Sequence, residues 1–378
     1  MQHNLHIVSF DVPYPADYGG AIDVFYKIKA LHKQGCNIYL HCYEYGRGTA
    51  PELEKYCTRL WYYKRNTGIG GMSLSLPYII SSRSDKALLK RLTEIDAPIL
   101  FEGVHTTFFL NHGALKNRFK AIRVHNIEHE YYALLSQKET GFLKKTYFGL
   151  EAGLLKKYEH QLKAAQAFYA LSNEDHLFFK KQYPAAQHEF IPPFHQYDAV
   201  TIQEGAGNYC LYHGNLSHPE NIEAALYLLT KVFPFVNSRV IIAGKNPVKA
   251  IETACGALPN CTLVANPGRP EMDDLIANAQ THALLTFQQS GMKLKLLSAL
   301  YGGRHVIVNK AMLHGTGMPS GICLRADSDA EFIEQINAAS TTPFTAVDIE
   351  NRRRLLHTYG NDVNAGKLMK AIFGMANG

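Results

Sequence analysis

Short apolar runs alternate with longer amphipathic stretches along the whole chain, a pattern typical of βα units built around parallel sheets. Seven runs of strand length occur in the first half, at residues 5–10, 37–43, 59–63, 98–102, 121–125, 167–172 and 189–193. Six more follow at 209–214, 239–244, 261–266, 283–287, 305–309 and 322–326. Residues 195–207, between the two sets, show no periodicity. The pattern predicts two doubly wound α/β domains joined near residue 195.

Composition narrows the classes of partner. The 378 residues are 46% hydrophobic and 19% charged, which is ordinary for a globular protein and excludes a disordered chain. The 39 basic and 33 acidic residues are dispersed and give a net charge of +6. This charge is too mild for a nucleic-acid-binding protein, so we expect no nucleic-acid partner. It suits an anionic small ligand or an acidic membrane surface.

The cysteines and the chain start bear on localisation. Seven cysteines form no CxxC pair and mostly lie in apolar runs, which indicates reduced thiols in the cytoplasm. No apolar stretch has the length of a membrane span, and the N-terminus enters a strand pattern without the features of a signal peptide. We expect a cytoplasmic protein whose membrane contact, where it has any, is peripheral at the inner face of the cell membrane.

Candidate chemistry in the first half follows the strand ends, because ligands of doubly wound folds bind there. A Gly-Gly pair opens the helix after the first strand, where it lets a phosphate or sugar approach or simply serves the turn. Two polar clusters follow the fourth and fifth strands, which predicts one shared cleft. These residues are Gly19 and Gly20, then Glu102 and His105, then His125, Asn126, Glu128 and His129. Zinc is a weaker alternative, because HNIEH lacks the HExxH spacing and has no cysteine nearby, so we predict no metal site.

Three strand-to-helix turns in the second half share another composition. Each offers glycine, free backbone amides and a polar or cationic side chain. The residues are Gly214 and Asn215, then Gly244 and Lys245, then Ser290 and Gly291 with Lys293 and Lys295. A helix starting at Ser290 would place lysines at its positive end, a conflict that a bound anion resolves. The turns together predict a phosphate-bearing ligand, and the alternative is that the lysines are only solvated.

Residues 141–165 form one long amphipathic stretch. Its apolar stripe is flanked by the lysine pairs 144–145 and 156–157, and consists of Leu143, Tyr147, Leu150, Leu154, Tyr158 and Leu162. Such a stripe either packs on its own sheet or associates weakly with a membrane.

The motifs PYPADYGGAIDVFYKIKAL, HNIEHEYY, HGNLSHPENIEAA, IIAGKNP and SGMKLKLLSALYGGRHVIVN, in this order, resemble the GT-B glycosyltransferases. The closer resemblance is to the GT4-like group (glycosyltransferase family 1 type) of retaining enzymes, and it covers nearly the whole chain. It implies two Rossmann-like parallel-sheet domains facing a cleft. An acceptor-side domain would span residues 1–195 and be completed by a crossing helix within 362–378. A nucleotide-sugar domain would span residues 196–361.

The resemblance also assigns roles. It implies that the histidine after the fifth strand, His125, contacts the transferred sugar, and we take His125 and Glu102 as the catalytic candidates. His105, Asn126 and Glu128 are the acceptor-side candidates. The donor-binding candidates are Gly19, Gly20, Gly214, Asn215, Gly244, Lys245, Ser290, Gly291, Lys293, Lys295 and Ser298. The implied partners are a nucleotide-sugar, as substrate and without a further cofactor, and a glycan or lipid-linked sugar acceptor.

This sequence departs from the GT4 pattern at the donor side. Asn215 and Glu220 stand where the family carries an Arg and a Lys, and Ser290 and Ser298 replace two glutamates. A neutral hydrogen bond is worth about half a charge-assisted one. Lys245, Lys293 and Lys295 can replace the lost cations, although Lys293 and Lys295 would point to nearly opposite sides of one helix.

These departures leave two hypotheses open. The first is a metal-independent glycosyltransferase of cell-surface polysaccharide synthesis, and the second is a GT-B protein without catalysis that binds a sugar-nucleotide or glycan. An epimerase on the same fold is a third, weaker alternative.

Overall fold

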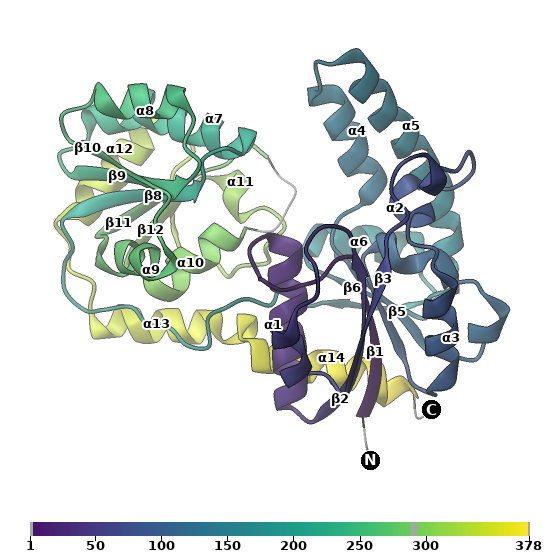
Figure 1. The fold of residues 1–378 in the computed structure, drawn as a ribbon. Coiled ribbons are helices and arrows are strands. Elements are labelled where there is room, and N and C mark those ends of the chain that lie inside the picture. The colour runs from purple at the N-terminus through teal and green to yellow at the C-terminus, as the bar shows by residue number, and fades with distance from the viewer. Residues whose placement is uncertain (1–2, 289–292, 377–378) are drawn as a thin grey trace. The chain divides into compact units, whose positions relative to one another are not determined.

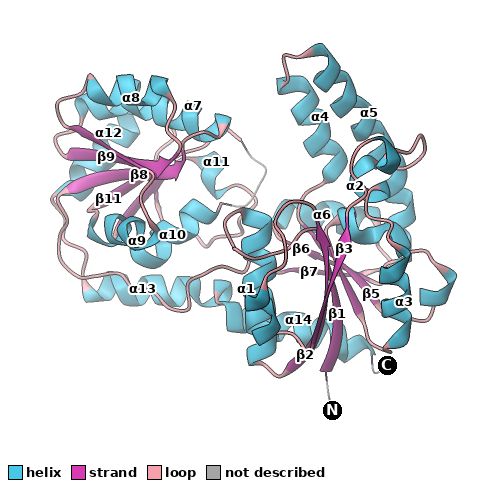
Figure 2. Ribbon diagram, in the orientation of Figure 1, coloured by secondary structure: helices cyan, strands magenta, loops and turns pink. Residues whose placement is uncertain are grey.

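The computed structural model describes residues 3–288 and 293–376, and its chain forms two compact units (Figure 1). The first comprises residues 1–196 and 361–378, and the second comprises residues 197–360. Each unit is a single parallel sheet with helices on both faces (Figure 2). The prediction of two parallel-sheet α/β domains is confirmed.

The first unit has a seven-stranded sheet in the order β3-β2-β1-β4-β5-β6-β7. Its strands are β1 (His3–Ser9), β2 (Cys36–Glu44), β3 (Arg59–Lys64), β4 (Ile99–Glu102), β5 (Lys120–Val124), β6 (Ala167–Ala170) and β7 (Gln187–Phe190). Its helices are α1 (Gly19–Lys33), α2 (Tyr78–Ser81), α3 (Lys86–Glu94), α4 (Glu128–Lys138), α5 (Phe142–Tyr158), α6 (Asn173–Gln182) and α14 (Asn361–Ala376). The strand order reverses between β1 and β4, and such a switch point is where doubly wound folds bind ligands.

Alternation along the strands divides the core of the first unit into two layers. Ile7 of β1 packs in the layer that contains α1 and α14, whereas the next residue, Val8, packs in the layer that contains α3 and α5. Helix α14 lies against α1, and Leu368 is among its fully buried residues. The last helix of the chain is therefore part of the first unit.

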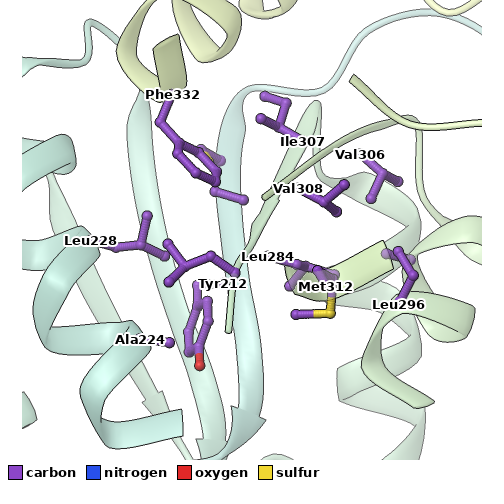
Figure 3. Close-up of a cluster of buried hydrophobic side chains, with 14 of the residues drawn as sticks. Tyr212, Ala224, Leu228, Leu284, Leu296, Val306, Ile307, Val308, Met312 and Phe332 are labelled. Carbon is purple, nitrogen blue, oxygen red and sulfur yellow. The ribbon is translucent and has the colours of Figure 1, made fainter. Parts of the chain in front are cut away.

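The second unit has a six-stranded sheet in the order β10-β9-β8-β11-β12-β13, reversing between β8 and β11. Its strands are β8 (Tyr209–Asn215), β9 (Arg239–Lys245), β10 (Cys261–Ala265), β11 (Thr281–Leu284), β12 (His305–Val308) and β13 (Leu324–Arg325). Its helices are α7 (Pro219–Tyr227), α8 (Lys249–Gly256), α9 (Arg269–Asn278), α10 (Leu294–Gly302), α11 (Lys310–Leu313), α12 (Asp329–Ser340) and α13 (Ala346–Leu356). Figure 3 shows its core, a cluster of buried side chains to which Tyr212, Leu284 and Val308 of the sheet and Phe332 of α12 belong.

One predicted helix boundary is wrong. Helix α10 begins at Leu294 with Lys293 as its N-cap, rather than at Ser290. Ser290 and Gly291 lie outside the described residues, so their assignment to the donor stays a prediction. None of the described helices is both long enough and apolar enough to cross a bilayer.

Candidate functional site

The switch point of the first unit carries a carboxylate and a histidine in contact. Glu102 is the last residue of β4, and His125 follows directly after β5, its neighbour in the sheet. Glu102 is fully buried, and the His125 side chain is 8% exposed. The two meet at 3.2 Å, between His125 Nε2 and Glu102 Oε2. The two residues taken as catalytic candidates are thus brought together.

Glu102 is one member of a buried chain of charges that the sequence did not reveal. Lys27 Nζ lies 2.8 Å from Glu102 Oε1 and 2.9 Å from Asp23 Oδ2. Arg123 Nη2 in turn lies 2.9 Å from Asp23 Oδ1. Two cations and two carboxylates thus alternate in a network with no solvent exposure, which we call the Asp23–Arg123 network. Burial acts to raise the pKa of Asp23, but the charges of Arg123 and Lys27 outweigh it and hold that pKa well below its ordinary value.

This network sets the hydrogen-bonding state of His125. A carboxylate can only accept hydrogen bonds, so His125 donates to Glu102 from Nε2 and its proton is assigned there. In a neutral imidazole this tautomer leaves a lone pair on Nδ1. His125 also stands edge-on to the ring of Phe10, with ring centroids 5.3 Å apart, which fixes its plane.

The same residues have the spacing of a metal site but already contain a cation. Ligand atoms of Asp23, Glu102 and His125 all lie within 4.8 Å of one another. The Lys27 ammonium touches both carboxylates and takes the position that a metal ion would need. The arrangement therefore favours a lysine-neutralised network over a metal centre.

The acceptor-side candidates gather next to this network. The Phe10 ring packs against His105 as well as His125, with centroids 5.5 Å and 5.3 Å away. Glu128, the first residue of α4, places Oε1 3.9 Å from His105 Nδ1, and neither atom has a hydrogen-bond partner among the described residues. Burial raises the pKa of Glu128 to about 8, a shift that its hydrogen bond with Asn126 opposes. Burial also holds the pKa of His105 well below its ordinary value.

Replacing Glu128 with glutamine is expected to flatten the pH dependence of stability between about pH 5 and 8. The pKa of this 3%-exposed carboxyl rises from 4.5 to about 8 on folding. The folded chain therefore keeps a proton that the unfolded chain loses, and the free energy of unfolding falls as pH rises through this window. Urea titrations should give similar stabilities for the two proteins at pH 5, and a Glu128→Gln variant more stable by roughly 3–5 kcal/mol at pH 8.5.

The matched control is Glu130→Gln, an exposed carboxylate on the same helix, which should leave the pH profile as it is. A Glu128→Gln profile parallel to that of the unmodified protein would show that Glu128 is ionised in the folded state.

The glycine pair has a packing role of its own. Helix α1 begins at Gly19, and a Cβ on Gly20 would come within 2.6 Å of Phe10 Cζ. A side chain at position 20 would therefore displace the Phe10 ring, so glycine has a packing reason here without a ligand. Contact of Gly19 and Gly20 with a ligand stays a prediction.

The donor-side candidates of the second unit lie at neighbouring strand ends. Asn215 ends β8 and pairs in register with Lys245, which ends β9. A Cβ on Gly244 would come within 1.8 Å of Gly214 O, so the close approach of these strands requires glycine. Asn215 Oδ1 accepts hydrogen bonds from the amide and hydroxyl of Ser217, at 3.1 and 2.8 Å, and closes the turn before α7.

The two lysines near α10 are held by partners within the unit. Lys293 Nζ donates to Gln288 O at 3.0 Å, and Lys295 Nζ donates to Asn221 Oδ1 at 2.7 Å. Burial lowers the pKa of Lys295 to about 8, and the charge of Glu220 opposes the shift. Burial likewise lowers the pKa of Lys293, again against Glu220. These side chains are therefore not simply solvated, and a carboxylate lies near both.

Lys293 and Ser298 are placed differently from what the sequence predicts for the helix near residue 290. Lys293 and Lys295 do not project from opposite sides of one helix, because Lys293 precedes the first residue of α10. Ser298 Oγ accepts a hydrogen bond from Tyr197 at 2.7 Å and donates to Leu294 O at 3.1 Å. Its hydroxyl thus serves the packing of this unit, and its contact with a donor stays a prediction.

Comparison with known proteins shows which solved structures share this fold. No family model matches the chain. A protein of Klebsiella pneumoniae described as an uncharacterized 44.6 kDa protein in the cps region is 26% identical over 338 residues, 83% of this chain and 85% of that protein. WaaG, a glycosyltransferase of lipopolysaccharide biosynthesis, superposes with a TM-score of 0.58 at 15% identity, covering 98% of this chain and 100% of that chain.

Two further solved structures match. The α,α-trehalose-phosphate synthase of Burkholderia xenovorans gives a TM-score of 0.60 at 10% identity over the full length of both chains. A chain of the GtfA/B complex gives 0.55 at 13% identity, and the match covers 77% of this chain but only 61% of that longer chain. The two parallel-sheet units are thus those of the GT-B glycosyltransferase fold.

Proposed function

We propose that the protein is a glycosyltransferase that moves a sugar from a nucleotide-sugar to a glycan or lipid-linked acceptor in cell-surface polysaccharide synthesis. The observation that carries the proposal is the contact of His125 with Glu102 at the switch point of the first unit, backed by a buried network. The GT-B fold and a relative in a cps region support the same class of reaction.

In this proposal the reaction is retaining and needs no metal ion. Cleavage of the sugar–phosphate bond develops negative charge on the leaving diphosphate, which backbone amides and a lysine of the second unit stabilise. His125 accepts a hydrogen bond at Nδ1 from a hydroxyl of the transferred sugar. The leaving phosphate accepts the proton of the acceptor hydroxyl on the same face, so no separate base is required.

A second candidate function is a sugar-nucleotide or glycan-binding protein without catalysis. It is favoured by the side chains at the donor positions, because Asn215 and Ser298 are neutral and already hydrogen-bonded within the unit. Glu220 adds a negative charge near Lys293 and Lys295, where a diphosphate would bind.

A thermal-shift screen against UDP-, GDP- and ADP-sugars tests donor binding. A ligand at a hundred times its dissociation constant adds about 2.7 kcal/mol, so one nucleotide class should raise the melting temperature by about 5–10 °C. Lys295→Met should weaken that binding at least about tenfold, because it removes a charge-assisted contact.

Lys249→Met, which replaces an exposed lysine of α8, is the control and should bind the donor like the unmodified protein. If no nucleotide-sugar raises the melting temperature, the donor site is absent. The remaining candidate is then a glycan-binding protein.

A further inference from the structure

An exposed apolar surface lies on the first unit. Eight large apolar side chains of the described residues are more than 60% exposed, and six of them belong to segment 69–74 or to the first half of α5. They are Ile69, Met72, Leu74, Phe142, Leu143 and Leu150, and we call them the apolar ridge. A concentration of this kind marks an interaction surface rather than scattered surface residues.

The two segments of the ridge are tied together. The amide of Tyr78, just after the first segment, donates to Glu151 Oε2 on α5 at 2.8 Å. Helices α4 and α5 pack side by side and extend from the sheet of the first unit (Figure 1). Both segments of the apolar ridge are therefore attached to the folded first unit.

The two ends of the predicted amphipathic stretch differ in burial. Tyr158 and Leu162, at the end of the predicted stripe, are buried against the unit's own core, as packing on the sheet requires. Leu143 and Leu150, nearer the start of the stripe, are exposed. Intramolecular packing thus accounts for only one end of the stripe.

The segments that carry the apolar ridge are rich in basic residues, which indicates the kind of partner that the ridge binds. Residues 64–78 and 138–157 carry seven basic side chains, Lys64, Arg65, Lys138, Lys144, Lys145, Lys156 and Lys157, but only two acidic ones, Glu139 and Glu151. Glu151 is buried and bonded to Tyr78, so it adds little to the outer surface. Apolar side chains among basic ones match a lipid surface with anionic headgroups, whereas two copies of this surface would repel each other.

We propose that the apolar ridge docks the protein reversibly on an anionic membrane. Leucine, isoleucine and phenylalanine side chains enter the headgroup region, while the lysines meet lipid phosphates. Because α4 begins three residues after His125, docking would hold the first unit where a lipid-linked acceptor lies. The link to a lipid-linked acceptor rests on the proposed function, whereas the docking itself does not.

Co-sedimentation of the full chain with vesicles tests the proposal. Phosphatidylcholine vesicles with added phosphatidylglycerol should bind the protein at low salt, and pure phosphatidylcholine vesicles should bind it far less. A Leu74→Ser/Leu143→Ser variant should lower the partition coefficient at least about tenfold, because two apolar side chains no longer leave water. A Lys144→Gln/Lys145→Gln variant should bind anionic vesicles less tightly, while its weak binding to pure phosphatidylcholine vesicles should not change.

The matched control is Phe235→Ser/Val347→Ser, which removes two exposed apolar side chains from the second unit and should bind vesicles normally. Protein that stays in the supernatant with anionic vesicles at low salt would overturn the proposal. So would a dimer, seen by light scattering, that the Leu74→Ser/Leu143→Ser variant converts to a monomer. Nucleotide-sugar thermal shifts in the same variants separate the two proposals, since docking can fail while donor binding persists.

Discussion

Replacing Lys27 with methionine should lower the free energy of unfolding by about 3–5 kcal/mol, because removing one partner of a buried ion pair leaves an uncompensated charge. Lys27 Nζ is the cation between Asp23 and Glu102, and all three side chains are fully buried. Methionine fills similar space but neutralises neither carboxylate. Urea or guanidinium titration at neutral pH measures the loss.

The matched control is Lys33→Met, in the same helix. Lys33 pairs with Asp362, but the two side chains are 69% and 58% exposed, so losing this pair should cost less than about 1 kcal/mol. A Lys27→Met/Glu102→Gln variant removes one cation and one anion together and should recover part of the stability. It also provides a folded comparison where Lys27→Met alone fails to fold. A loss below about 1 kcal/mol in Lys27→Met would show that water reaches the carboxylates.

The fold could be predicted because it depends on local patterns. The central strands of each sheet are buried on both faces and read as short apolar runs, such as residues 98–102, where β4 ends at Glu102. The boundary of α10 could not be predicted in this way. Ser290 and Gly291 resemble a helix start, but Lys293, an ordinary solvent-facing residue by sequence, is the N-cap.

The candidate site was harder to predict because its key contacts join distant positions. The places of Glu102 and His125 at strand ends predict them as site residues, whereas Asp23 and Lys27 lie within helix α1. The sequence does contain a signal for Asp23 and Lys27. Both lie on the same face of α1 as Val24 and Ile28, and this face of the helix is buried. A carboxylate and an ammonium four residues apart on an apolar face indicate a buried pair. The pairing of Asp23 with Arg123, 100 residues away, requires the sheet to be assembled.

Replacing His125 with alanine should lower kcat for sugar transfer by about a hundredfold to a thousandfold, if the protein is the glycosyltransferase proposed above. This is the size of effect expected when one preorganised hydrogen bond to the transition state is removed. The donor KM should change little, because the nucleotide is proposed to bind through the second unit. Transfer can be followed with the donor identified by thermal shift, and NMR of the product should show the anomeric configuration of the donor retained.

His129→Ala is the control, since His129 on α4 also pairs with a buried glutamate, Glu159, but lies outside the Asp23–Arg123 network. It should change kcat less than about threefold, far below the effect of losing a transition-state contact. Unfolding midpoints of both variants separate catalytic loss from instability. An active His125→Ala enzyme would remove His125 from the chemistry, whereas an inverted product would make its Nδ1 a general base for the acceptor hydroxyl. If the unmodified protein binds a nucleotide-sugar yet transfers nothing to any acceptor, the neutral side chains at Asn215 and Ser298 are the physical reason, and the protein is a binding partner rather than an enzyme.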